Sequence, residues 1–293
     1  MNGAIVVDKP PEWTSHDVVN RVRRIAGTRK VGHLGTLDPS ATGVLPLLLN
    51  RATRLAQFFT RNDKVYEGVI RFGWSTDTYD AEGAPTSRCI DLILERERLE
   101  EIFAPFRGLI LQTPPPVSAK KIAGRPAYEL ARKNVAVELK PVEVTVRALE
   151  ILWVEGAEAG VRVDCSAGTY LRSVAHDAGQ ALGCGAHLKS LRRLRSGQFT
   201  LKQARTLDQL AQLAAENRLG EALVPAMQLL PEFPNEVVDQ LTEAQIRQGR
   251  DFRVSPFRVR DGVKLVKAVS RSGDLIAIGE AVMPNLYHPI LVL

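Results

Sequence analysis

The chain has 293 residues, of which 45% are hydrophobic and 25% are charged, and its formal net charge is +6. This composition excludes a wholly disordered chain and suffices for one large hydrophobic core, or for a large and a small one. The longest apolar run, Val44 to Leu49, is far shorter than the roughly 20 residues that a membrane-spanning helix needs. With no signal-peptide pattern and three widely spaced cysteines, we expect a protein of the reducing cytoplasm, without membrane, disulfide framework or zinc.

The basic residues gather in three segments of the chain. Residues 21–30 and 187–205 contain Arg and Lys but no acidic residue, and residues 247–271 hold eight basic residues against two acidic ones. A single basic run is usually a solvated face, whereas three separate runs of one sign favour a surface that binds a polyanion.

The first elements follow simple patterns. Residues 3–10 form a β-branched run that ends at two prolines, which is typical of a strand. A helix is predicted over residues 14–27, with Thr14 or Ser15 as its N-cap, an apolar stripe on one face and arginines on the other. Further along the chain we predict helices at residues 51–59, 94–106 and 169–183, strands at residues 64–73, 142–155 and 160–168, a turn-rich segment at 76–85, and a proline-broken loop leading into a short basic helix at 111–134.

Residues 230–236 contain two prolines and indicate a domain boundary. The pattern beyond them predicts one helix and several short strands, hence a small β-rich domain. Because helices and strands mix without regular βαβ alternation, the α+β class is favoured for the chain.

The segment VGHLGTLDPSATGVLPLLL, residues 31–49, contains a single acidic residue, Asp38. An aspartate before a proline is a common helix N-cap, which is one interpretation of Asp38. Gly32, Gly35 and Gly43 lie close by and favour another, in which the backbone approaches a ligand closely. The residues alone leave both interpretations open.

This segment resembles the signature of the TruB family of tRNA pseudouridine synthases, which isomerise a uridine in the T loop of tRNA. Four further stretches resemble the family's motifs, in the family's order: DKPPEWTSHDVV (8–19), KVYEG (64–68), QTPPPVSAKKIAGRPAYELAR (112–132) and CSAGTYLRSVAHDAGQALGCGAHLKSLRRLRSG (165–197). The resemblance implies a mixed, largely antiparallel sheet flanked by helices over residues 1–231. The tail, residues 232–293, resembles a PUA-like RNA-binding domain more weakly.

By this resemblance Asp38 is the catalytic carboxylate. Pseudouridine formation breaks the N1–C1′ bond and joins C5 to C1′ without consuming water, so no second carboxylate is needed to activate a water molecule. An aspartate beside C1′ can stabilise positive charge on the sugar, attack it, or take a proton from the ribose, and the sequence leaves these roles open. With a reference pKa of about 3.9, it is expected to be ionised at neutral pH.

The resemblance also implies the substrate contacts. Tyr66, which by default is a core aromatic in a strand, stacks on the extruded uracil. Arg172 pairs with Asp38 and keeps it ionised and oriented. Tyr170 lines the same pocket, and Leu191 meets the edge of the uracil through its backbone.

The remaining predicted contacts are with the rest of the RNA. His33 stacks against displaced T-loop bases. The predicted phosphate contacts are Lys9, Lys120, Lys121, Arg192 and Arg193, although each of these residues alone is more often a solvated cation. No metal or organic cofactor is expected, and the expected partner is the T arm of tRNA, bound by a monomer with no obligate protein partner.

Two other functions stay open at this point. The basic runs and the C-terminal domain fit an RNA-binding module that remodels the tRNA elbow, a function that can coexist with catalysis. Related catalytic domains also occur in guide-RNA particles, but those relatives carry long basic extensions, whereas this chain begins just ahead of its first strand.

Overall fold

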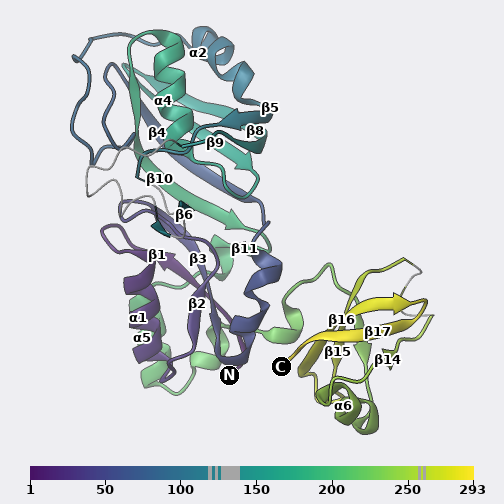
Figure 1. Cartoon of the computed structure of the whole chain (residues 1–293). Helices are drawn as coiled ribbons and strands as arrows, with labels where there is room; N and C mark the ends of the chain where they lie inside the picture. The colour runs from purple at the N-terminus through teal and green to yellow at the C-terminus, as the bar shows by residue number, and fades with distance from the viewer. Residues whose placement is uncertain (118–120, 123–124, 127–138, 257–258, 260–261) are drawn as a thin grey trace.

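The computed structural model describes residues 1–117, 121–122, 125–126, 139–256, 259 and 262–293. In these residues one 10-stranded sheet forms the larger part of the molecule, and a 5-stranded sheet forms a smaller C-terminal unit beside it (Figure 1). A two-stranded ribbon pairs β6 (Lys121–Ile122) with β7 (Arg125–Pro126). The α+β class is confirmed.

The large sheet has the strand order β12-β1-β3-β10-β4-β9-β8-β5, with β2 paired to β3 and β11 paired to β10. Its strands are β1 (Gly3–Lys9), β2 (Val31–His33), β3 (Thr42–Leu49), β4 (Lys64–Phe72), β5 (Gly108–Gln112), β8 (Val142–Glu155), β9 (Glu158–Cys165), β10 (Ala186–Ser196), β11 (Phe199–Thr200) and β12 (Leu223–Pro225). Neighbouring strands are antiparallel except at the parallel pairing of β3 with β10. The predicted mixed, largely antiparallel sheet is therefore confirmed.

Helices cover each half of this sheet. Around β1 to β3 lie α1 (Ser15–Ile25) and α5 (Leu207–Ala215), and around β4 to β9 lie α2 (Arg96–Phe103) and α4 (Leu171–Leu182) (Figure 1). Of the two predicted N-caps of α1, Thr14 is the one in the structure, and it forms a capping box with Asp17. Short 3₁₀ turns connect the elements: η1 (Asn50–Phe59), η2 (Ala104–Phe106), η3 (Leu201–Gln203), η4 (Leu219–Ala222) and η5 (Ala226–Gln228).

Two local predictions differ from the structure, and one strand was not predicted. Residues 51–59 are not α-helical but belong to η1, where Ala52 and Leu55 are buried at the three-residue spacing of a 3₁₀ helix. The basic run that begins at His187 is the central strand β10, which lacks an apolar alternation because it buries an arginine. The segment 111–134 begins inside β5, and its predicted helix lies largely outside the described residues.

The C-terminal unit contains β13 (Asn235–Val237), α6 (Gln240–Arg247), β14 (Phe252–Arg253), β15 (Leu265–Val269), β16 (Leu275–Met283) and β17 (Leu286–Val292). It has its own small core, and it shares a second apolar cluster with η1 and β11 of the larger unit. The buried Lys267 donates from Nζ to the carbonyls of Met227 and Leu229, at 3.0 and 2.9 Å, across this junction. No helix among the described residues is long and apolar enough to cross a membrane.

Candidate active site

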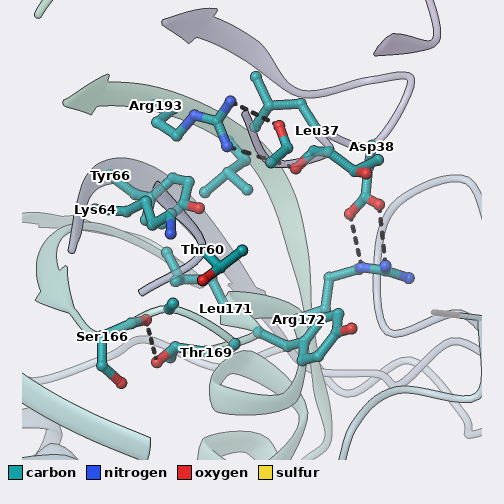
Figure 2. A pocket seen from close by; sticks show the side chains of 16 residues that line it. Leu37, Asp38, Thr60, Lys64, Tyr66, Ser166, Thr169, Leu171, Arg172 and Arg193 are labelled. Carbon is teal, nitrogen blue, oxygen red and sulfur yellow. Dashed lines mark hydrogen bonds and ion pairs between the residues drawn. The ribbon is translucent and has the colours of Figure 1, made fainter. Parts of the chain in front are cut away.

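Asp38 lies in a loop between β2 and β3, residues 34–41. The loop is not the start of a helix: a single turn closes it, with Ala41 N donating to Asp38 O at 3.1 Å. The helix N-cap interpretation of Asp38 is therefore wrong. Its side chain is 36% exposed and lines a cavity of about 290 Å³ between the two halves of the large sheet (Figure 2).

Lys9, at the end of β1, is the first of three groups that hold this loop. The residue is 1% exposed, and its Nζ donates to Pro39 O at 2.8 Å, to Ala41 O at 2.6 Å and to Pro10 O at 2.9 Å. Burial lowers the pKa of Lys9 to about 8, and the Asp38 carboxylate opposes this shift. The predicted phosphate contact of Lys9 is corrected here, because a buried ammonium that bonds three carbonyls has no donor left for RNA.

Arg193, on β10, holds the loop from the opposite side. It is 1% exposed and donates from Nε to Val44 O at 2.7 Å and from Nη2 to Gly35 O at 3.1 Å. Arg193 also lines the cavity, so its predicted phosphate contact stays a prediction. Gly43 has φ +99°, and a Cβ there would stand 2.2 Å from Arg193 O, so glycine is required for backbone packing against β10.

The third group is Ser15, the first residue of α1. Its Oγ accepts a hydrogen bond from Leu37 N at 2.9 Å and donates one to Leu37 O at 3.2 Å. Of the three glycines in this segment, Gly43 packs against protein backbone, a Cβ on Gly32 would meet nothing within 4 Å, and Gly35 lines the cavity. The loop is thus fixed by buried polar side chains from a strand, a helix and a second strand, which orients Asp38 before any substrate binds.

Arg172 stands in the first turn of α4 and meets Asp38 side-on. Its Nε lies 2.9 Å from Oδ2 and its Nη2 lies 3.1 Å from Oδ1, as the two dashed lines in Figure 2 show. Burial raises the pKa of Asp38, and the Arg172 guanidinium opposes that rise. Arg172 is itself 5% exposed, so the pair is a charge-assisted, two-point contact between a buried guanidinium and a partly exposed carboxylate.

A second carboxylate, Asp80, shares Arg172. Its Oδ2 lies 3.5 Å from Arg172 Nη1, and the same nitrogen donates to Thr78 O at 3.2 Å. The backbone of Glu82 and the hydroxyl of Thr78 both donate to Asp80 Oδ1, at 3.1 and 2.6 Å, which aims the other oxygen at the arginine. The sequence of this segment predicted only a series of turns, and Asp80 was not singled out as a site residue. The residues around a carboxylate in a turn do not indicate that it contacts an arginine far away in the chain.

Tyr66 and Lys64 lie on β4, on the side of the cavity opposite Asp38 and Arg172 (Figure 2). Burial raises the pKa of Tyr66, and the nearby charge of the Arg193 guanidinium opposes that rise. The phenol therefore stays protonated at neutral pH and offers an aromatic ring rather than a base.

Tyr170 and Leu191 complete the predicted lining, and both contact the cavity. The backbone of Tyr170 is held by Gln112, at the end of β5, whose amide accepts from Tyr170 N at 2.8 Å and donates to Tyr170 O at 3.1 Å. Gln112 is buried and was not singled out from the sequence, although it lies inside the quoted proline-rich motif.

Of the other predicted contacts, His33 ends β2 and does not line this cavity, and its Nδ1 is a buried atom without a hydrogen-bond partner among the described residues. Arg192 is partly exposed and pairs with Asp8, its Nη2 lying 2.8 Å from Oδ2. Lys120 lies outside the described residues, and Lys121 is described through its backbone in β6 alone.

A second hollow, of about 750 Å³, lies beside the loop and is lined by Lys9, Trp13 and three arginines: Arg21, Arg24 and Arg192. No ion pair found within the described ranges includes Arg21 or Arg24, so both α1 guanidinium groups can take an anionic partner. No group of three His, Cys, Asp or Glu side chains in the described part of the chain is placed to hold a metal.

One carboxylate held by a buried arginine, an aromatic ring across the cavity from it and a groove with three arginines thus lie in one region of the protein. Comparison with known proteins gives the class. Residues 23–171 match the family described as "TruB family pseudouridylate synthase (N terminal domain)", and residues 172–231 match "tRNA pseudouridylate synthase B C-terminal domain". The chain belongs to the TruB family of pseudouridylate synthases.

Individual relatives agree with this assignment. The chain is 64% identical to the tRNA pseudouridine synthase B of Solibacter usitatus, with all of both chains covered, and 42% identical to that of Aquifex aeolicus, with 96% of each covered. Among solved structures it is similar to one titled "Crystal structure of the archaeal box H/ACA sRNP Nop10-Cbf5 complex", with a TM-score of 0.73, 27% identity and coverage of 99% of this chain and 85% of that one. These relatives support an isomerase that makes pseudouridine.

Proposed function

We propose that the protein isomerises uridine 55 in the T loop of tRNA to pseudouridine, with residues 1–231 as the catalytic domain and residues 232–293 as a PUA-like RNA-binding domain. The observation that carries the proposal is the two-point contact of Arg172 with Asp38 at the cavity that Tyr66 lines. The choice of T loop rests on the motifs of the sequence and on relatives named tRNA pseudouridine synthase B.

The cavity explains why the target base has to leave its stack. Asp38 is partly enclosed at the cavity, and its carboxylate is tied to a buried guanidinium, so it cannot move out to a duplex. An extruded uridine can enter, with its uracil against Tyr66 and its ribose towards Asp38, which is how enzymes reach bases inside folded nucleic acids. Leu191 also lines the cavity and can meet the uracil edge through its backbone.

In the reaction the N1–C1′ bond breaks, the uracil turns, C5 bonds to C1′, the C5 proton leaves, and N1 is protonated. Asp38 acts at the sugar, by attack, by charge stabilisation or by removal of a ribose proton. In each role it has to be ionised, and Arg172 opposes the rise in its pKa that burial causes. A preorganised charge in a nearly water-free site stabilises a transition state far more than one in water does.

The groove on α1 gives the RNA backbone a path to the cavity. Within the residues that the structure describes, neither Arg21 nor Arg24 forms an ion pair, and Trp13 lines the same groove with an apolar ring. Lys9 borders this groove and also holds the loop of Asp38, so RNA bound along α1 passes next to the active site. Phosphate contacts of this kind set register and affinity rather than sequence preference.

The test is incubation of the purified protein with an unmodified tRNA transcript, followed by chemical labelling of pseudouridine and mapping by primer extension. We expect one labelled position, in the T loop. Absence of label there contradicts the proposal. Because no other RNA or protein is added, formation of product also excludes the guide-RNA particle as the required setting. Intact-mass measurement is not suitable, since product and substrate are isomers.

Remodelling of tRNA is a second candidate function, favoured by the separation of the groove from the cavity. Arg21 and Arg24 do not line the cavity of Asp38, so RNA binding is separable from chemistry. An inactive Asp38→Asn variant that still accelerates the refolding of a misfolded tRNA transcript would establish both functions. A variant that no longer does so would exclude a separate folding function.

A further inference from the structure

Tyr79 and His176 form the closest ring pair found in the described part of the molecule. Their ring centroids lie 3.7 Å apart and their planes are inclined by 8°, so the rings are stacked face to face. Tyr79 belongs to the loop of residues 76–85, and His176 lies on α4. Neither residue lines the cavity of Asp38, and neither has a part in the chemistry above.

The backbone at Tyr79 has an unfavourable conformation for an aromatic residue. Its φ is +66°, in the left-handed region that a bulky side chain adopts rarely and at a cost in free energy. Hydrogen bonds hold the chain in this conformation: Leu188 N donates to Tyr79 O at 3.0 Å, and Ala81 N donates to Leu188 O at 3.1 Å. These bonds fix the loop to β10, while the ring reaches across to α4.

Tyr79 and His176 contact each other through the faces of their rings, and their polar side-chain atoms take no part in the contact. The Tyr79 hydroxyl has no hydrogen-bond partner among the residues that the structure describes. His176 Nδ1 is likewise a buried atom without a partner in that part of the chain. Burial of an unsatisfied nitrogen is unfavourable, so a purely structural position here would be filled better by an apolar residue.

The position of the stack relates it to the active site. Tyr79 stands between Thr78, whose carbonyl accepts from Arg172 Nη1 at 3.2 Å, and Asp80, whose carboxylate lies 3.5 Å from the same nitrogen. His176 follows Arg172 by four residues on α4, so the two side chains emerge from the same face, one turn apart. The loop therefore contacts one face of α4 at two successive turns.

We propose that Tyr79 and His176 are positioning residues for catalysis, acting through Arg172. The stack keeps the loop against α4, so that Thr78 and Asp80 occupy Nη1 of the arginine. The Nε and Nη2 groups then remain directed at Asp38, at 2.9 and 3.1 Å. This inference rests on the proposed role of Asp38, and it adds two residues that lie outside the cavity.

The test compares Tyr79→Phe with Tyr79→Gly. Tyr79→Phe keeps the ring and should keep the single-turnover rate within about twofold of wild type, because the hydroxyl has no partner. Tyr79→Gly removes the ring while relieving the left-handed backbone, so thermal stability should change little. The rate constant on a tRNA transcript should nevertheless fall about 10- to 100-fold, with the dissociation constant for tRNA unchanged. A rate within twofold of wild type for Tyr79→Gly overturns the proposal.

His176 supplies the second arm. His176→Phe should retain the rate, and His176→Leu should lower it as Tyr79→Gly does. The double variant, with Tyr79→Gly and His176→Leu together, should be no slower than either single variant, because the same ring contact is lost in all three. Multiplicative losses would show that the two residues act separately and would contradict the proposal. Phe233→Leu, which alters another aromatic pair with Phe58, is the matched control and should leave the rate unchanged.

A readout without RNA separates this inference from the proposed function. In the NMR spectrum of the free protein, the Arg172 Nε–H signal should be protected from solvent exchange in wild type and in Tyr79→Phe, and should exchange at least about tenfold faster in Tyr79→Gly. Equal protection in all three proteins contradicts the positioning role, whatever the enzyme does to tRNA. A wild-type protein that makes no pseudouridine, but shows this difference in protection, contradicts the proposed function alone.

Discussion

The two loops that meet at Arg172 are built in different ways. Residues 34–41 are held by buried side chains from distant elements: Lys9, Ser15 and Arg193. Residues 76–85 are held mainly by their own turns and by backbone bonds to β10. The first loop thus depends on the cooperative stability of the whole domain, whereas the second can open locally. The carboxylate proposed to react stands on the first loop, and the one that supports its arginine stands on the second.

The largest effect should come from Asp38→Asn. The amide keeps the shape of the side chain and leaves the anchors of the first loop in place, but it removes the charge. We expect the single-turnover rate constant to fall at least about 1,000-fold, with thermal stability and tRNA affinity close to wild type. Rapid-quench assays measure the rate constant, and a filter-binding titration measures the tRNA affinity. Retained turnover would remove Asp38 from the chemistry.

Arg172→Lys should have the next largest effect, because both loops converge on its guanidinium. A lysine keeps one positive charge but cannot make the side-on contact, and we expect a loss of about 100-fold in rate. Burial raises the pKa of Asp38 and Arg172 opposes the rise, so the weaker partner lets that pKa climb further. Since activity requires the ionised carboxylate, the acid limb of the pH–rate profile should move to higher pH.

The matched control for that variant is Arg195→Lys, which alters an exposed ion pair with Asp164, 3.0 Å apart on the same sheet. Exposed pairs contribute little, so its rate and pH profile should stay as in wild type. A shift of the acid limb in both variants would show that the shift does not depend on the contact between Arg172 and Asp38.

Lys9→Met tests the anchoring of the first loop. The substitution leaves the carbonyls of Pro39 and Ala41 without their donor inside the protein, which should lower the free energy of unfolding by about 2–4 kcal/mol. Urea denaturation measures this loss. Lys189→Met breaks an exposed pair with Glu158 and should cost below about 1 kcal/mol. Equal losses of unfolding free energy in the two variants would mean that the hydrogen bonds of Lys9 do not stabilise the first loop more than an exposed ion pair does.

Asp77→Ala should have the smallest effect. Its Oδ1 accepts from Ala84 N at 2.8 Å within an exposed turn of the second loop, and such a bond contributes about 0.5–1 kcal/mol. The change should appear as faster amide exchange confined to residues 76–85. Exchange that accelerates in both loops together would contradict their independence.

The sequence predicted the parts of the site that depend on local patterns and motifs. The helix of Arg172, the strand of Tyr66 and the loop of Asp38 all follow from periodicity, capping and glycine placement. What it did not predict is burial. Lys9 and Arg193 were expected to meet phosphates, whereas in the structure both are buried and donate to carbonyls of segments far away in the chain.

Asp80 and Gln112 were missed for a related reason. Asp80 lies in a turn and Gln112 at the end of a strand, positions that do not stand out in the sequence. Each contacts a residue at the start of α4: Asp80 pairs with Arg172, and Gln112 accepts from Tyr170 N. Periodicity cannot reveal such pairs, because they depend on how the halves of the sheet are brought together. The same holds for β10, whose buried arginine breaks the alternation that marks a strand.

The most direct test is a crystal structure of the Asp38→Asn variant bound to a T-arm RNA. The proposal predicts one uridine out of its stack, with its ring against Tyr66 and its C1′ within about 3.5 Å of the amide at position 38, the separation of reacting groups in productive complexes. A T loop that keeps every base stacked, or a uridine held away from this cavity, would contradict it.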